Sequence, residues 1–447
     1  MAIEQTLYAL SADGVYPFHM PGHKRNPAFA FCEHPVSLDT TEVTGTDDLH
    51  DPHGMLAETM ALAARLTGSR QSYLLINGST AGLLAGITAA THRGDTVLVA
   101  RNCHRSVAHA LALAGVNPIW LSPTWNAALG TYEHLSPETV RQALLAHPEA
   151  TLTVMTSPTY EGVVSEIAAI AETVHAAGGT LLVDEAHGAH FGYSPLFPKS
   201  AVTLGADIVV QSLHKTLPSP TQTALLHVCS DRVDSDRVQR QLSIFQTSSP
   251  SYLLMAGIDT CLRLLEAHST ELFAAYEQRL TSFRHTAAPW LLPANGDPGK
   301  LILPCENGAQ LARDLREQFG LETEMHGAHH VLAMTSVADT DEGFERLATA
   351  LAALRPTPSA DSIACPPLPT VAVSPATAYN SESERVPLAE AAGRVAAEEL
   401  YCYPPGIPLT VAGERLTDEL VCYIAKQQAA GVHIRGAENE TVKVLLK

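Results

Sequence analysis

The amino-acid sequence predicts an α/β protein with a mostly parallel sheet that carries helices on both faces, plus smaller α+β structure toward the C-terminus. Between residues 56 and 265, short apolar runs alternate with Ala-rich stretches of helical character. That alternation is typical of parallel strands connected by helices. The strand-like runs are QSYLLI, DTVLVA, TLTVMT, TLLVDE and ADIVVQ, and the helical stretches include TAGLLAGITAATHRG and IAAIAETVHAAGG.

The length of the chain, 447 residues, exceeds what one ordinary core supports, so we expect two or three domains. YPFHMPGHKRNP has no periodicity and indicates an arm, whereas six prolines between Pro356 and Pro375 indicate an extended linker. PLAEAAGRVAAEEL and LTDELVCYIAKQQAAG are expected to form C-terminal helices. The predicted parts are an N-terminal arm (1–55), a large domain (56–265), a small α+β domain (266–355), a Pro-rich linker (356–385) and a C-terminal helical segment (386–447).

The composition is that of a globular protein, with 46% hydrophobic and 17% charged residues. A net charge of −19 argues against nucleic acid or an anionic membrane as a partner, since both require a basic surface. The N-terminal residues lack a signal-peptide pattern, and no apolar run approaches the roughly 18 residues of a membrane span. Eight scattered cysteines without a C-x-x-C pair indicate reduced thiols, and hence a cytoplasmic protein.

Each strand-like run of the predicted sheet is followed by a polar cluster. Open parallel sheets bind ligands beyond the carboxyl ends of their strands, so five such clusters together indicate a site. The clusters are NGSTAG (77–82), RNCHRS (101–106), SPTYEG (157–162), DEAHGAH (184–190) and QSLHK (211–215).

Taken singly, each cluster also has a purely structural explanation. NGST could simply cap a helix, Asp184 could cap the next one, and Lys215 could reach solvent. NGST at a helix start also suits a phosphate, and a buried Asp184 needs a cationic partner. His187 and His190 suggest a metal, but no further ligands follow at a suitable spacing, so we expect none. Together, the phosphate seat, carboxylate, imidazole and lysine match the requirements of pyridoxal phosphate.

The sequence also resembles the Orn/Lys/Arg decarboxylases, which are bacterial pyridoxal-phosphate enzymes of the aspartate-aminotransferase fold with a seven-stranded sheet. The resemblance covers nearly the whole chain and is to the shorter members, without the receiver-like wing domain. One departure is TVAGE after YPPGIPL, where the family usually has Pro-Gly-Glu, which leaves the role of Glu414 open. The motifs that carry the resemblance are FHMPGHKRN, RNCHRS, VDEAHGAHFG, SLHKTLPSPTQTALLHV, TSSPSYLLMA and YPPGIPL.

The resemblance implies roles around the cofactor ring for five residues. Lys215 would bind the aldehyde of the cofactor, and Asp184 would pair with the ring nitrogen. His104 would stack on one face of the ring and Ala186 would pack on the other. His187 belongs to the same cofactor site.

The resemblance likewise assigns five hydroxyl-bearing residues to the cofactor phosphate. Ser79, Thr80 and Ser212 would bind the phosphate of their own subunit. Thr247 and Ser248 match a segment that reaches the phosphate of a neighbouring subunit, which predicts a homodimer or a larger assembly.

The function that the resemblance implies is decarboxylation of arginine, lysine or ornithine to agmatine, cadaverine or putrescine, and hence polyamine biosynthesis. His214 or Lys215 would return a proton to the carbon that loses CO₂. The cationic tail of the substrate needs an acidic partner, because an unpaired buried cation costs several kcal/mol. The candidate partners are Glu161, Glu185, Asp47 and Asp48.

Two other functions remain open at this stage. The first is an aminotransferase or another enzyme of the same fold. Aminotransferases commonly bind the substrate α-carboxylate through an arginine of the small domain, and residues 320–343 contain none, although Arg435 lies further along. The second is a non-catalytic relative, against which the intact NGST, Asp184 and Lys215 argue.

Overall fold

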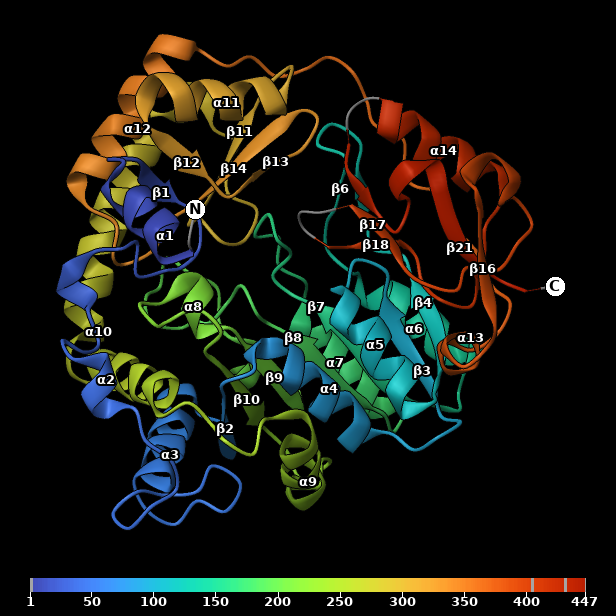
Figure 1. The fold of residues 1–447 in the computed structure, drawn as a ribbon, viewed down its shortest axis with the longest axis horizontal. Coiled ribbons are helices and arrows are strands. Elements are labelled where there is room, and N and C mark those ends of the chain that lie inside the picture. The colour runs from blue at the N-terminus through green and yellow to red at the C-terminus, as the bar shows by residue number, and fades with distance from the viewer. Residues whose placement is uncertain (1–2, 403–405, 430–431, 447) are drawn as a thin grey trace.

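The computed structural model describes residues 3–402, 406–429 and 432–446, and its centre is a seven-stranded sheet (Figure 1). The strand order is β2-β10-β9-β8-β7-β3-β4, in which β10 runs antiparallel to its neighbours and every other adjacent pair is parallel. The predicted fold class is confirmed, although the sequence pointed to five of these strands and missed β4 and β10. The strands are β2 (Gln71–Leu75), β3 (Thr96–Ala100), β4 (Asn117–Leu121), β7 (Ala150–Thr156), β8 (Thr180–Asp184), β9 (Ile208–Gln211) and β10 (Ala224–Val228).

Helices cover both faces of this sheet, because successive strand side chains point to opposite faces. Along β3, Val97 and Val99 pack with α4, α5 and α9, whereas Leu98 packs with α6 and α7. Helix α4 lies so close to the sheet that a Cβ on Gly82 would come within 2.6 Å of the Leu75 side chain. The helices are α4 (Gly78–Ala90), α5 (Arg105–Ala114), α6 (Pro137–Ala146), α7 (Ile167–Ala176) and α9 (Ser235–Phe245).

A second, smaller sheet lies beside the first, and the long helix α10 packs against both regions (Figure 1). Its strand order is β11-β14-β13, and the N-terminal strand β1 pairs with β12 in parallel next to it. The domain boundary predicted between residues 265 and 266 falls inside α10. The elements are α1 (Ile3–Ala12), β1 (Tyr16–Phe18), α2 (Pro35–Leu38), α3 (Met55–Thr67), α10 (Tyr252–Thr286), β11 (Lys300–Pro304), α11 (Gly308–Phe319), β12 (Leu321–Thr323), β13 (Met325–His326), β14 (His330–Met334) and α12 (Asp341–Leu354).

The C-terminal region consists of short strands around one longer helix, so the expectation of a helical segment at 386–447 is wrong in part. The second predicted helix forms α14, but PLAEAAGRVAAEEL forms only a short 3₁₀ turn and extended chain. There, Ala396 bridges to Val444, so tertiary packing overrides the helix propensity of an Ala- and Glu-rich run. The elements are β15 (Thr370–Val371), α13 (Pro375–Tyr379), β16 (Ser383–Pro387), η4 (Leu388–Glu390), β17 (Leu400–Cys402), β18 (Pro408–Thr410), β19 (Glu414–Arg415), α14 (Asp418–Ala429), β20 (Ile434–Arg435) and β21 (Thr441–Leu445).

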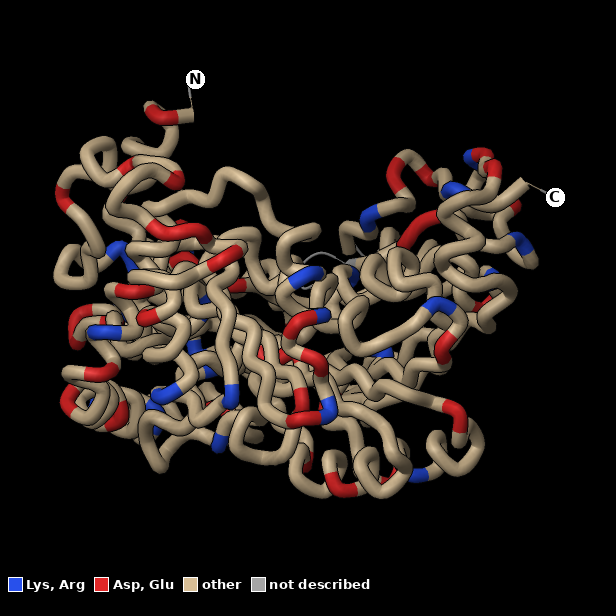
Figure 2. Tube along the Cα trace, turned by 90° about the horizontal axis from the view of Figure 1, so that it is seen from below, with Lys and Arg blue, Asp and Glu red and all other residues tan. Residues whose placement is uncertain are grey.

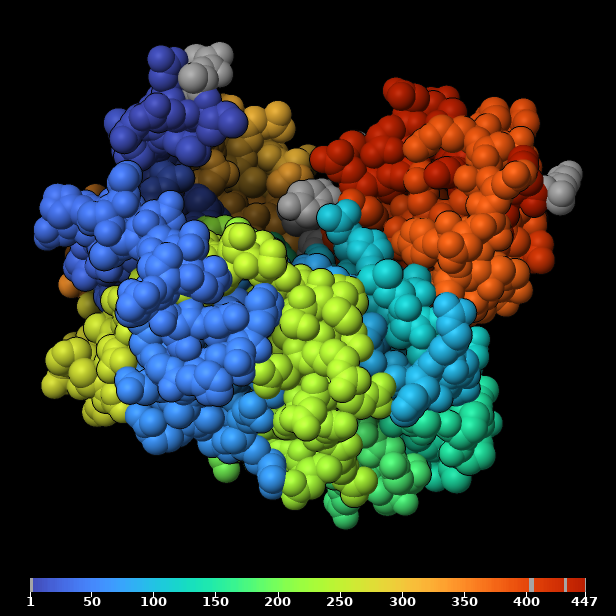
Figure 3. All heavy atoms as spheres, turned by 60° about the horizontal axis from the view of Figure 1, so that its bottom comes forward, coloured from blue at the N-terminus to red at the C-terminus, as the bar shows by residue number. Residues whose placement is uncertain are grey.

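The surface view in Figure 3 shows a hollow between the N-terminal arm with the small sheet on one side and the C-terminal region on the other. Acidic residues lie along loops and helices on both sides of the molecule, in keeping with the net charge of −19 (Figure 2). Across the described residues, no helix combines the length and apolar character that a bilayer crossing requires.

A buried ion pair joins the C-terminal region to the large sheet. Arg101 follows β3, and its guanidinium donates to both carboxylate oxygens of Glu414 over 2.6 and 2.9 Å and to the Leu409 carbonyl over 2.8 Å. Glu414 also accepts from the hydroxyl of Thr410 and the backbone N–H of Val411. Glu414 therefore holds two parts of the fold together. Residues 403–405 of the neighbouring YPPGIPL motif lie outside the described residues.

We expect Glu414→Ala to destabilise the C-terminal region by about 3–5 kcal/mol, because it leaves the buried Arg101 guanidinium without its carboxylate. Urea unfolding followed by circular dichroism, with hydrogen exchange over residues 406–446, measures this loss. The control is Glu398→Ala, which removes a partly exposed pair with Arg385 and should cost less than about 1 kcal/mol. Equal losses in the two variants would contradict the anchoring role of Glu414.

Candidate active site

The polar clusters predicted at strand ends meet at one edge of the large sheet. Strands β3, β7, β8 and β9 are parallel, and the register places Thr156, Asp184 and Val210 side by side. Because parallel strands all end at the same edge, the loops that follow them converge there. Most of the residues predicted for the cofactor ring lie in these loops.

Lys215 lies in α8 (Leu213–Thr216), a single helical turn after β9, in which Leu213 and Thr216 are buried. The turn directs the amine inward, where Lys215 Nζ lies 3.0 Å from His187 Nε2. Burial lowers the pKa of Lys215, and the carboxylates of Asp184 and Glu324 only partly oppose this effect. The lysine is therefore not a solvated surface residue, and its neutral, nucleophilic form is more accessible than that of a free lysine.

Three imidazoles surround this lysine. Burial and the nearby Lys215 lower the pKa of His187 well below its usual value. Burial likewise lowers the pKa of His104 to about 4 and that of His214 to about 4. All three rings are therefore neutral at physiological pH. His104 Nδ1 accepts the backbone N–H of Ser106. His214 Nδ1 lies 2.8 Å from the Thr223 carbonyl oxygen, which only accepts, so the ring proton of His214 is on Nδ1.

Asp184 ends β8 and is almost fully buried, at 3% exposure. Among the described residues, its carboxylate has one hydrogen bond, from the backbone N–H of Ala186, and no salt bridge. Burial raises the pKa of Asp184, against the influence of Lys215. A buried carboxylate with so few partners fits a ligand that brings its own positive charge, such as a protonated ring nitrogen.

The predicted phosphate residues gather at the start of α4. Ser212 donates a hydrogen bond to Ser79 over 2.9 Å, although they are far apart in sequence. Asn77 makes no side-chain cap, so backbone N–H groups of the first turn remain available for an anion. Thr80 is exposed on the same turn. These groups fit a phosphate.

Thr247 and Ser248 are exposed beside the predicted phosphate-binding residues at the start of α4. The backbone N–H of Thr247 donates to the Asn77 side chain over 3.3 Å, and its carbonyl lies 2.9 Å from His50 Nε2. Within one chain, the segment thus approaches its own α4, and the Thr247 hydroxyl accepts the backbone N–H of Ser249 over 3.2 Å.

The four acidic residues considered as partners of the substrate tail lie in different environments. Glu185 accepts from Ser200, Ala201 and Gln211 within an interior network, where burial raises its pKa to about 7. Asp47 binds backbone N–H groups of its own loop, and the exposed Asp48 binds that of His50. Glu161 is buried near Lys300 and its pKa is raised by that burial. Of the four, Glu161 is the one that acts electrostatically on Lys300, the partner of His187.

The sequence analysis missed three residues of the site: Lys300, Tyr160 and Glu324. Lys300 begins β11 and lies 2.9 Å from His187 Nδ1, and the Tyr160 ring packs edge-on against His187. The Tyr160 hydroxyl donates to Glu324, which also accepts the Met20 backbone N–H over 2.8 Å. The feature of the sequence that could have indicated Lys300 is its position at the start of the apolar run KLILP.

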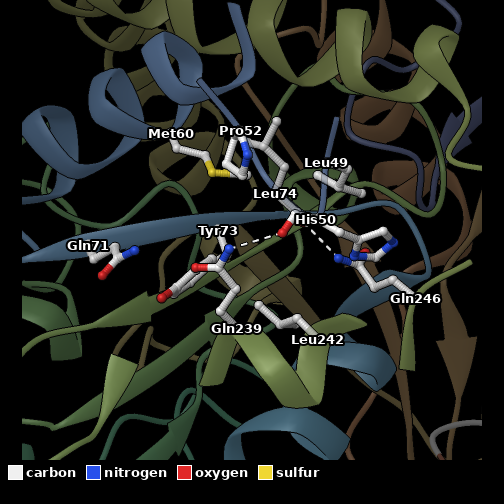
Figure 4. Close-up of a pocket in the computed structure, with 10 residues that line it drawn as sticks. All are labelled: Leu49, His50, Pro52, Met60, Gln71, Tyr73, Leu74, Gln239, Leu242 and Gln246. Atoms are coloured by element: carbon white, nitrogen blue, oxygen red, sulfur yellow. Dashed lines mark hydrogen bonds between the residues drawn. The ribbon is translucent and has the colours of Figure 1, made fainter. Parts of the chain in front are cut away.

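His190 lies 3.3 Å from Asp297, and His187 lies between two lysines, so neither is placed as a metal ligand. In the described parts of the chain, no group of three His, Cys, Asp or Glu side chains could hold a metal ion. A small pocket beside β2 and α9 contains none of the predicted site residues (Figure 4). There, Gln239 donates to the His50 carbonyl and Gln246 to that of Leu74, so the amides satisfy backbone groups.

Comparison with known proteins matches the chain to two family models. "Orn/Lys/Arg decarboxylase, major domain" covers residues 3–289, and "Orn/Lys/Arg decarboxylase, C-terminal domain" covers residues 360–444. The chain is 36% identical to the uncharacterised protein YaaO of Bacillus subtilis, over 96% of this chain and 95% of that protein. It is 32% identical to an arginine decarboxylase of Halalkalibacterium halodurans, over 96% and 93% of the two chains. The structure of the constitutive lysine decarboxylase of E. coli superposes with a TM-score of 0.80 at 21% identity, covering 99% of this chain and 81% of that one.

We expect Asp47→Asn to lower the free energy of unfolding by about 1 kcal/mol. Asp47 stabilises the loop before α3, because it accepts the backbone N–H groups of His53, Gly54 and Leu56. Burial opposes its ionisation, but these N–H groups prevail and hold the pKa of Asp47 below its usual value. A lowered pKa stabilises the fold above the unfolded value of about 3.9, and this contribution disappears as the pH falls through the folded value.

Urea unfolding at pH 7 and in acid measures both effects, since the Asn variant should lose less stability on acidification. Asp48→Asn is the matched control, because Asp48 binds the N–H of a single later residue, His50. Identical profiles for the two variants would refute the role of Asp47 in stabilising this loop.

Proposed function

The chain belongs to the Orn/Lys/Arg decarboxylase family, and we propose that it removes the α-carboxyl group of a basic L-amino acid, with L-arginine as the preferred substrate. The observation that carries the proposal is the partly buried Lys215 amine, of lowered pKa, near the poorly partnered Asp184 carboxylate. The arginine decarboxylase from H. halodurans, similar over nearly its whole length, supports arginine over lysine and ornithine.

The cofactor that suits this site is pyridoxal phosphate. In the proposed arrangement Lys215 would bind its aldehyde, Asp184 would neutralise its protonated ring nitrogen, and His104 and Ala186 would pack against its ring. Ser79, Thr80, Ser212 and the first turn of α4 would bind its phosphate. When bound, the cofactor supplies an electron sink for the electron pair that remains when CO₂ leaves.

The residues around Lys215 exclude water from the reacting carbon. His187, Ala186 and Ser212 are all at least nine-tenths buried. A dry environment favours loss of CO₂, because the charge of the carboxylate is dispersed as the bond breaks. We infer that substrate binding here is accompanied by loss of water from its α-carboxylate.

Proton return to the reacting carbon falls to Lys215 more readily than to His214. The His214 Nδ1–H is bound to the Thr223 carbonyl, and a pKa of about 4 leaves its Nε2 without a proton at neutral pH. The Lys215 amine, once displaced by the substrate, can carry a proton at Nζ.

The cationic tail of the substrate requires a carboxylate, and we propose Glu161 for this role. Asp47 and Glu185 already bind several donors of the protein. Glu161 is buried near Lys300, and beside its hydrogen bond with Thr159 the carboxylate has further acceptor capacity for an incoming cation. Glu324 lies nearby but already accepts from Tyr160 and the Met20 backbone.

Transamination is the main competing activity. Arg435, one candidate to bind an α-carboxylate, is exposed on β20 in the C-terminal region. Lys300 is a cation nearer to Lys215 that could bind an α-carboxylate, so transamination is tested alongside decarboxylation. The products distinguish the two activities, because transamination yields a keto acid and decarboxylation yields CO₂ and an amine.

We also propose that the protein works as a homodimer in the cytoplasm, where its amine product would feed polyamine biosynthesis. Exposed apolar side chains cluster in the N-terminal arm, which suits burial against a second copy. They are Ile3, Leu7, Tyr8, Leu10, Val36, Leu38 and Val43, with exposures between 41% and 88%.

We expect the purified, cofactor-loaded protein to release CO₂ from L-arginine faster than from L-lysine or L-ornithine. Lys215→Ala should abolish turnover while cofactor still binds non-covalently. Parallel assays of CO₂ and keto acid on all three amino acids are the measurement. Keto acid without CO₂ would favour the aminotransferase, and full activity of Lys215→Ala would refute the assignment of the site.

We expect active sites that are shared between two subunits. Mixing Lys215→Ala subunits with Thr247→Ala/Ser248→Ala subunits should restore activity above that of either variant, because half of the hybrid sites would be intact. If mixing restores nothing although the hybrid forms, each site is complete within one chain, as the contact of Thr247 with its own Asn77 would allow.

A further inference from the structure

His187 lies between two lysines that come from different parts of the fold. Its Nε2 is 3.0 Å from Lys215 Nζ, after β9, and its Nδ1 is 2.9 Å from Lys300 Nζ, at the start of β11. His187 and Lys300 are almost fully buried, at 5% and 2% exposure. Both ring nitrogens are thus engaged with amines, in a buried contact with Lys300 and a partly buried contact with Lys215.

The hydrogen bonds among Lys215, His187 and Lys300 limit how many protons these three side chains can carry together. A neutral imidazole has one N–H donor and one acceptor nitrogen, whereas an ammonium group only donates. Two ammonium groups cannot both donate to one neutral ring, because the ring N–H would then face a cation. One of the two lysines therefore faces the His187 N–H as a neutral amine.

Three carboxylates act on Lys300 and two on Lys215, while Lys215 itself lowers the pKa of Lys300. The Lys300 ammonium lies 5.6 Å from the centre of the Tyr160 ring, and Asp297, Glu324 and Glu161 all act on it electrostatically. Burial lowers the pKa of Lys300 to about 8, which still leaves it protonated at neutral pH. Its alkyl chain is tightly held, because a Cβ on Gly162 (φ +94°) would come within 2.6 Å of Lys300 Cγ.

On the basis of the proposed function, we propose that Lys300 is a positioning residue that acts through His187. Its ammonium donates to Nδ1, which places the ring proton on Nε2, and this N–H is donated to Lys215 Nζ. Lys215 is thereby held as a neutral amine whose lone pair can attack an aldehyde. The condensation forms a carbon–nitrogen bond, and the aldehyde oxygen leaves as water with two amine protons.

The other charged and titratable groups around this chain come from several elements. The carboxylate of Asp184 favours protonation of Lys215, as does that of Glu324, so they oppose the effect of Lys300. The remaining groups are neutral imidazoles or act mainly on Lys300. They are His104, His214, Tyr160, Glu161 and Asp297.

The first test uses the protein without cofactor and needs no activity. In ¹⁵N-histidine-labelled protein, nitrogen chemical shifts report which ring atom carries the proton, and His187→Gln identifies the His187 signals by their absence. We expect a neutral ring with its proton on Nε2. A proton on Nδ1 would make Lys300 the neutral amine and overturn the proposal.

The second test measures how fast pyridoxal phosphate loads onto the protein as a function of pH, from the absorbance of the lysine-bound cofactor. Lys300→Met removes a nearby cation, so Lys215 should hold its proton to higher pH. We expect the midpoint of the profile to rise by about one pH unit, with loading about tenfold slower at neutral pH. Lys300→Arg keeps the charge and the donor and should restore the wild-type midpoint.

The outcomes separate this inference from the proposed function. A wild-type midpoint in Lys300→Met, or a midpoint in Lys300→Arg as high as that of Lys300→Met, overturns the role of Lys300. A purely structural role would slow loading equally at every pH, without a shift of the midpoint, and would also overturn it. Wild-type protein that loads at no pH would contradict the proposed function, whereas the histidine tautomer would still decide the inference.

Discussion

Removal of the Lys215 amine from water is the constraint on which the site depends. An ammonium group in an apolar environment loses its hydration, so burial favours the neutral amine. The fold produces this burial by placing Lys215 on a single turn between the buried Leu213 and Thr216. Histidine is a suitable neighbour for such an amine, because a neutral ring can donate to it without adding charge. His187 fills that position at 3.0 Å.

Buried charges elsewhere in the protein join segments that are distant in sequence. Arg101 and Glu414 connect the large sheet to the C-terminal region. Lys24, in the N-terminal arm, lies 4.0 Å from Asp339 and donates to the Met334 carbonyl. Each pair would be costly if it were broken, because a single buried charge would remain. These pairs therefore favour one arrangement of the parts around the site.

The acids of the chain illustrate how residue type alone is ambiguous. Asp47, Glu185 and Glu161 all follow or precede expected elements, and any of them could bind a cation. In the structure, Asp47 binds backbone N–H groups, and Glu185 belongs to a network with Ser200 and Gln211. Only hydrogen-bond partners, which depend on the folded backbone, distinguish a structural carboxylate from one that remains available to a ligand.

Five strands of the large sheet with their intervening helices, and the convergence of NGST, Asp184 and Lys215, could be predicted from the sequence, whereas β4 and β10 were missed. Hydrophobic periodicity is a local property, and parallel strands necessarily end at one edge. The lack of an α-helix at residues 387–400 could not be predicted, because pairing of Ala396 with Val444 overrides local helix propensity. Nor could the sequence place Lys300 beside His187, since Lys300 lies 85 residues after Lys215. Only the packing of the small sheet against the large one brings the two amines to the same imidazole ring.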